Sequence, residues 1–74
     1  MARIPTDLNG AEVRKAFEKV GFAVTRQRGS HVVMHRQEPK GRLTVPDHNP
    51  VRVGTLRQLI ADAGLSVEEF LKLL

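Results

Sequence analysis

One short stretch of the chain, Arg26-Gln27-Arg28-Gly29-Ser30-His31, carries residue types suited to chemistry on a phosphodiester. It is predicted to be the end of one β-strand, a tight Gly-Ser turn and the start of the next strand. Such a position holds the His31 imidazole on a rigid element, with arginines nearby in the sequence. Imidazole suits proton transfer near neutral pH, and guanidinium suits phosphate. We therefore interpret His31 as a candidate catalytic residue.

RNA cleavage is the simplest reaction that such a set can support, because the ribose 2′-OH is itself the nucleophile. The protein then has to move protons and stabilise charge on the phosphorus. Gly29 and Ser30 also have a structural interpretation, as a left-handed turn residue and a serine that bonds backbone. The sequence leaves open which cation assists His31. The candidate RNA-binding residues are Arg26, Arg28, Gly29, Ser30, Lys40 and Arg57.

The histidines do not have the spacing of a metal site. His31 and His35 are predicted on the same face of one strand, where four steps of ~3.3 Å separate them by about 13 Å. His48 lies beyond the next strand, and no acidic cluster accompanies it. We therefore expect a metal-independent mechanism without a cofactor. His35 and His48 are interpreted as more typical of surface residues, although either could touch a substrate.

Composition predicts one small domain that binds a polyanion. The 74 residues include no cysteine, so the fold must be held by packing alone. The net charge is +4, and the span from Arg26 to Arg57 contains seven basic and two acidic residues. Clustered positive charge favours nucleic acid, although a solvated basic surface has the same signature. Three phenylalanines are too few for stacking on bases, so recognition of the RNA backbone is expected.

No apolar run approaches the ~20 residues of a membrane span, and the first residues lack the long apolar region of a signal peptide. We therefore expect a soluble, cytoplasmic protein with no membrane partner.

The hydrophobic pattern predicts an α+β domain in the order α-β-β-β-α plus a terminal helix. Asn9 and Glu12 form a capping-box pattern before the first helical stripe, and Ser66 and Glu69 form another before the last. The apolar stripe expected in the second helix is Leu56, Leu59, Ile60 and Ala63, and the stripe expected in the last helix is Val67, Phe70, Leu71 and Leu74. Short turns make the three strands an antiparallel meander, with the helices on one side. The expected elements are helix 10–20, strands 22–27, 31–37 and 42–45, a helix from 54–55 to Gly64, and a last helix after Ser66.

Several segments together resemble the HicA (YcfA) toxin family. They are Gly21-Phe22, Arg26-Gln27-Arg28-Gly29-Ser30-His31, Thr44-Val45-Pro46, His48 and Gly54-Thr55-Leu56-Arg57-Gln58-Leu59-Ile60. The resemblance covers roughly residues 9 to 74, and the chain is expected to form one domain of this family, residues 1–74. It implies a fold like that of double-stranded-RNA-binding domains, with His31 catalytic in an mRNA interferase that cleaves mRNA. It also implies a HicB-like antitoxin that covers the active site. Many relatives have His-Pro-Asp-Gly in the second turn, where this chain has Gln37-Glu38-Pro39-Lys40-Gly41.

Two other functions are compatible with the same pattern, because fold does not fix function. One is a non-catalytic RNA-binding domain on the same scaffold, and the other is a pure protein-interaction module. Incubation with single-stranded RNA separates the three by cleavage, retention without cleavage, or neither.

Overall fold

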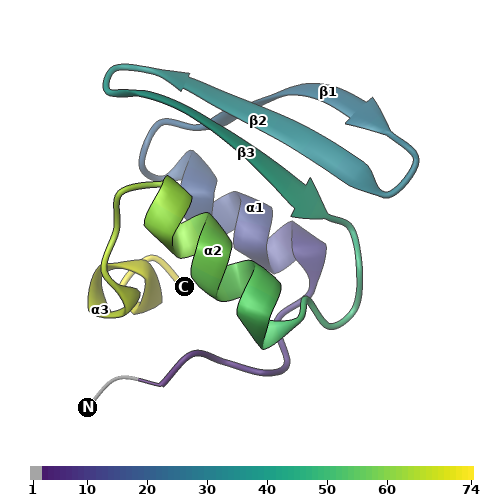
Figure 1. The fold of residues 1–74 in the computed structure, drawn as a ribbon, viewed down its shortest axis with the longest axis vertical. Coiled ribbons are helices and arrows are strands. Elements are labelled where there is room, and N and C mark those ends of the chain that lie inside the picture. The colour runs from purple at the N-terminus through teal and green to yellow at the C-terminus, as the bar shows by residue number, and fades with distance from the viewer. Residues whose placement is uncertain (1–2) are drawn as a thin grey trace.

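The computed structural model describes residues 3–74, so the first two residues of the predicted domain lie outside the described part. A three-stranded sheet lies on one layer of helices, in the predicted α-β-β-β-α order with a terminal helix (Figure 1). This α+β arrangement matches the expected double-stranded-RNA-binding-domain-like architecture. The elements are α1 (Gly10–Glu18), β1 (Ala23–Arg28), β2 (His31–Gln37), β3 (Lys40–Pro46), α2 (Val53–Asp62) and α3 (Val67–Leu71).

The sheet is an antiparallel meander in the order β1-β2-β3. Its second turn is tighter than predicted, because Gln37 pairs directly with Lys40 and leaves only Glu38 and Pro39 between the strands. The predicted turn 38–41 and strand 42–45 are therefore wrong in their bounds. Main-chain pairing extended the strand into a segment whose Pro and Gly content had indicated a loop.

Alternate residues of β2 and β3 form the sheet side of the hydrophobic core. Val32 pairs with Val45 and Met34 pairs with Leu43, and all four side chains are buried. The helices α1 and α2 cover this face of the sheet from one side, as predicted (Figure 1). They lie mainly under β3, and every residue of β1 is exposed. The opposite face of the sheet is left uncovered by the helices.

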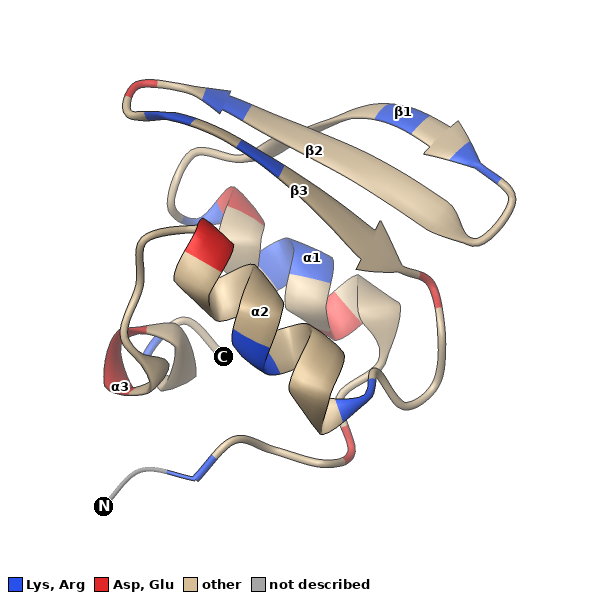
Figure 2. Ribbon diagram, viewed as in Figure 1, with Lys and Arg blue, Asp and Glu red and all other residues tan. Residues whose placement is uncertain are grey.

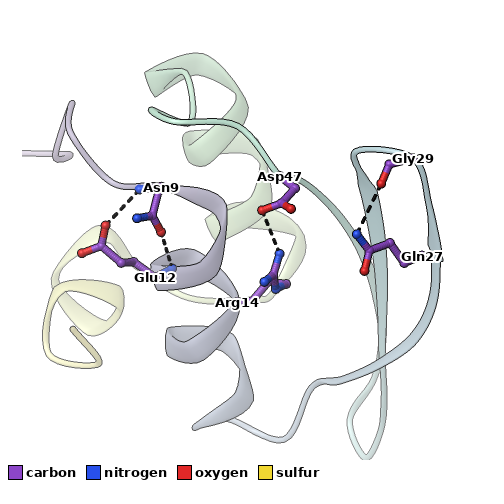
Figure 3. A network of polar contacts seen from close by, with 6 residues as sticks. All are labelled: Asn9, Glu12, Arg14, Gln27, Gly29 and Asp47. Atoms are coloured by element: carbon purple, nitrogen blue, oxygen red, sulfur yellow. Dashed lines mark hydrogen bonds and ion pairs between the residues drawn. The ribbon is translucent and has the colours of Figure 1, made fainter.

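The start of α1 is fixed by side-chain caps and by the loop that follows β3 (Figure 3). The predicted capping box is present: Asn9 Oδ1 accepts from the Glu12 amide at 2.9 Å, and Glu12 Oε1 accepts from the Asn9 amide at 3.0 Å. Arg14 forms an ion pair with Asp47 at 3.1 Å. A Cβ at Gly10 would lie 2.7 Å from the Pro46 carbonyl oxygen, so the close approach of loop and helix requires glycine there.

The helical stripes fill the core largely as predicted. The four stripe residues expected for the second helix, Leu56, Leu59, Ile60 and Ala63, are all buried. The Phe70 ring of α3 lies 5.3 Å from the Phe17 ring of α1, which connects the terminal helix to the core. The stripe prediction fails at the C-terminus, where Leu74 is 50% exposed because α3 ends at Leu71.

The last helix begins with the predicted capping box. Ser66 Oγ accepts from the Glu69 amide at 3.1 Å, and the Ser66 amide donates to Glu69 Oε1 at 2.9 Å. The backbone hydrogen bond from Ser66, followed by its side-chain bond, lowers the pKa of the Glu69 carboxyl. This is an electrostatic feature of the helix layer, remote from the uncovered face of the sheet.

Candidate active site

The uncovered face of the sheet is formed by the side chains that alternate with the core residues of β2. Because successive residues of a strand point to opposite faces, His31, Val33 and His35 point away from the helices. They line a shallow hollow of about 540 Å³ with residues of both neighbouring strands. The full set of lining residues is Thr25, Arg26, Arg28, His31, Val33, His35, Arg42 and Thr44. We call this surface the open face.

His31 is the first residue of β2, and its side chain is exposed. Its partner on β1 is Arg28, and its partner on β3 is Pro46. Directly opposed residues have Cβ atoms about 5 Å apart, and diagonal neighbours lie within about 8 Å. Arg28 is therefore the nearest cation to His31 in the sheet, and Arg26 is the next along β1.

The turn before His31 is held by its main chain. Gly29 has φ +57°, and nothing lies within 4 Å of the place a Cβ would occupy. Glycine is thus required there by backbone conformation and not by lack of space. The Gly29 carbonyl accepts from Gln27 Nε2 at 3.3 Å (Figure 3), and the Ser30 carbonyl accepts from the Asp47 amide at 2.6 Å. The first bond lies within the turn, and the second fixes the turn relative to the loop after β3.

A β-bulge in β1 brings a residue to the open face that strict alternation would place on the helix side. The register with β2 shifts between Val24 and Arg26, which leaves Thr25 without a partner. Thr25 Oγ1 lies 2.6 Å from His35 Nδ1 in a hydrogen bond, and 3.5 Å from the Val33 carbonyl oxygen. Thr25 therefore holds the His35 ring by one of its two nitrogens.

The charge of the sheet is of one sign. The three strands contain five basic residues and no acidic residue. The acidic residues lie on the helices and loops, as Figure 2 shows. Arg26, Arg28 and Arg42 line the hollow itself. An anion on the open face thus meets several cations and no strand carboxylate.

Arg36 belongs to the basic span of the sequence but lies on the helix side of the sheet, opposite Gly41. Its guanidinium donates to the carbonyl oxygens of Pro39 at 2.8 Å, Ala63 at 3.1 Å and Val20 at 3.4 Å. It also stacks 4.3 Å above the centre of the Phe22 ring. Arg36 is a structural residue that joins the sheet to the ends of both long helices.

The structure brings together only some of the predicted site residues. His31, Arg26 and Arg28 share the hollow, and Gly29 and Ser30 form the turn at its end. Lys40 begins β3 opposite Gln37, six strand positions from His31, or about 20 Å. Arg57 is exposed on α2 in a separate hollow. That second hollow is lined by Arg3, Ile4, Thr6, Val53, Arg57 and Val67.

Five lining residues are absent from the sequence-based set: Thr25, Val33, His35, Arg42 and Thr44. The spacing of His31 and His35 already indicated a shared strand face, and Arg42 lies in the basic span. Nothing in the sequence indicated Thr25, because its position depends on the bulge. His48 is exposed in the loop after β3 and is not part of the hollow.

Among residues 3–74, no three His, Cys, Asp or Glu side chains are grouped so that they could hold a metal ion. Over the same residues, no helix is both long and apolar enough to span a membrane.

The fold and the hollow define a small α+β domain with a cationic, histidine-bearing sheet face. The model of the HicA toxin family of bacterial toxin–antitoxin systems matches residues 10–65 of the chain. The chain belongs to this family, and it is therefore a toxin of a toxin–antitoxin system with an antitoxin as its partner. No curated protein matches the sequence.

Proposed function

We propose that this toxin is an endoribonuclease, an mRNA interferase, that cleaves mRNA with His31 as a proton-transfer residue and without a metal ion. The observation that supports it is an exposed imidazole at the end of a hollow that contains three arginines. Imidazole exchanges protons readily near neutral pH, and guanidinium groups stabilise a pentacoordinate phosphorane.

The reaction needs only groups that RNA and the open face contain. The 2′-oxygen attacks the adjacent phosphorus as its proton is removed, and the bond from phosphorus to the 5′-oxygen breaks. The products are a 2′,3′-cyclic phosphate and a 5′-hydroxyl. His31 carries out one proton transfer, and Arg28 and Arg26 are the nearest candidates to stabilise the charge.

Binding is proposed to follow the RNA backbone. All three phenylalanines of the chain are buried in the core, so none is free to stack on a base. Arg26, Arg28, Gly29 and Ser30 contact the phosphate at the cleavage site. Lys40 and Arg57 would contact the RNA only at a distance from it, at the far end of the sheet and on α2. Affinity should therefore fall steeply with salt.

The antitoxin is proposed to be HicB-like and to inhibit the toxin by covering the open face. An acidic surface on the antitoxin would complement the cations there. Both partners are expected in the cytoplasm, where mRNA is translated.

Purified wild-type protein and the His31→Ala and His48→Ala variants should be incubated with single-stranded RNA, with and without EDTA. His31→Ala is expected to lose at least about a hundredfold in rate. His48 is the matched control, because it is an exposed histidine outside the hollow, and its variant should cleave normally. Normal cleavage by a folded His31→Ala protein would refute the proposal. RNA retained without cleavage by the wild type would favour a non-catalytic binding domain, and activity lost in EDTA and restored by a divalent ion would refute metal independence.

A further inference from the structure

The open face carries a second histidine with the geometry of a proton-transfer residue. His35 follows His31 by four residues on the same face of β2, and both rings line the same hollow. Their Cα atoms are about 13 Å apart by strand geometry, with Val33 between them. Arg26 is the cross-strand partner of Val33 and therefore lies at the middle of this span. The order along the face is imidazole, guanidinium, imidazole.

This order matches what in-line cleavage of a phosphodiester requires. The attacking and leaving oxygens lie on opposite sides of the phosphorus, so the group that removes a proton and the group that supplies one must also be on opposite sides. A phosphate held by Arg26 would have one histidine toward each end of the hollow. A single histidine at one end has no comparable access to both oxygens.

His35 is also oriented, as a proton-transfer residue needs to be. Thr25 Oγ1 lies 2.6 Å from Nδ1, and the same oxygen lies 3.5 Å from the Val33 carbonyl. The hydroxyl can accept from Nδ1–H and donate to the carbonyl, which leaves Nε2 free to exchange a proton. The charged and titratable groups near His35 on the open face are His31 on β2, Arg26 on β1, and Lys40 and Arg42 on β3. No carboxylate faces it from the three strands.

We propose that His31 and His35 divide the two proton transfers of RNA cleavage, and that Thr25 positions His35. This inference rests on the proposed ribonuclease function. One neutral imidazole takes the 2′-hydroxyl proton as the bond from the 2′-oxygen to phosphorus forms. The other, as an imidazolium, gives its proton to the 5′-oxygen as the bond from phosphorus to that oxygen breaks. Exchange with water restores both rings.

The test uses two RNA substrates that differ in one atom. In the second substrate, sulfur replaces the bridging 5′-oxygen at the cleavage site, and a thiolate leaves without being protonated. His31→Ala and His35→Ala are each expected to cleave ordinary RNA at least about a hundredfold more slowly than the wild type. On the sulfur substrate, one of these variants but not the other should recover to within about tenfold of the wild type. His48→Ala is the matched control.

Thr25 is tested separately, as a positioning residue. Thr25→Val should slow cleavage of ordinary RNA about tenfold, and Thr25→Ser, which keeps the hydroxyl, should recover most of that loss. Circular dichroism and thermal unfolding establish that each variant is folded.

The outcomes separate this inference from the proposed function. If wild-type cleavage depends on His31 but a folded His35→Ala or His35→Gln variant cleaves within about threefold of the wild-type rate, the role of His35 is overturned. The proposed ribonuclease function is then unaffected. Recovery of neither variant, or of both, on the sulfur substrate overturns the division of the two transfers. A wild-type protein that cleaves neither substrate overturns the proposed function and this inference together.

Discussion

The two faces of the sheet are built from alternating residues of the same strands, yet they have opposite physical character. The helix-facing side presents Val32 and Met34, which are fully buried and held by packing. The open face presents His31 and His35, which are exposed, among arginines. A small domain has few apolar residues with which to form a core, so the apolar residues of the sheet are concentrated on the helix-facing side, which supplies the stability. The other face is left free to bind an anion.

Two arginines make the same contrast within one residue type. Arg36 faces the helices and has its guanidinium bonded to three main-chain carbonyls. Arg26, ten positions earlier, is exposed in the hollow of the open face. Positive charge in a sequence therefore does not by itself distinguish a ligand-binding cation from a structural one. Strand register makes the distinction here.

The largest difference in stability is expected between substitutions at Met34 and at its neighbour Val33, because the two side chains point to opposite faces of the sheet. Met34→Ala should lower the free energy of unfolding by about 2–5 kcal/mol, because it leaves a cavity in a fully buried part of the core. Val33→Ala should cost about 1 kcal/mol or less, because Val33 is only half-buried on the open face. Urea denaturation measures both, and equal losses would contradict the division between the faces.

The next effect concerns the two arginines. Arg36→Ala removes three hydrogen bonds and the contact with Phe22, so the free energy of unfolding should fall by about 1–3 kcal/mol. Cleavage by the folded Arg36→Ala protein should stay near the wild-type rate. Arg26→Ala should change stability by no more than about 0.5 kcal/mol. A stable Arg36→Ala protein with impaired cleavage would reverse these assignments.

A smaller effect is expected on RNA affinity and its salt dependence. The double variant Arg26→Ala/Arg28→Ala should make the plot of log affinity against log salt less steep by about 1.4. Each phosphate contact on a single strand contributes about 0.7 to the steepness of this plot, and the variant loses two such contacts. Fluorescence anisotropy with uncleavable 2′-O-methyl RNA gives this slope. Arg57→Ala should lower it by less, because Arg57 lies outside the hollow. Lys15→Ala on α1 is the control, and a slope unchanged in the double variant would argue against the open face as the RNA site.

The smallest effect on stability is expected outside both faces of the sheet, at the capping box that begins α3. Hydrogen bonds from Ser66 lower the pKa of Glu69 below its ordinary value of 4.5. The ionised carboxylate therefore adds stability above its unfolded-state pKa, and this contribution is lost as the pH falls through the lower folded-state pKa. The stability difference between the wild type and Glu69→Gln should shrink between pH 7 and pH 3. A difference that grows on acidification would contradict this cause.

Much of the architecture could be predicted from local patterns. The capping boxes at Asn9 and Ser66, the stripe of α2 and the Gly29-Ser30 turn depend on residues a few positions apart. The extent of β3 was predicted less well, because Lys40 is in the strand through a pairing with Gln37 that local composition did not indicate. The three residues His31, Arg26 and Arg28 were selected from sequence, and they share one hollow because the turn between them is short.

The sequence by itself determined the order of elements, the core stripes and the position of His31 beside a turn, because these follow from local spacing and residue type. Only the tertiary structure decided which side chains share the open face. The bulge at Thr25 reverses the side that each earlier residue of β1 faces, and it brings a hydroxyl to His35. The same register directs Arg36 into the protein, and α2 holds Arg57 away from the hollow. Those placements depend on pairing between strands and on helix packing, which bring together residues that are distant in the chain.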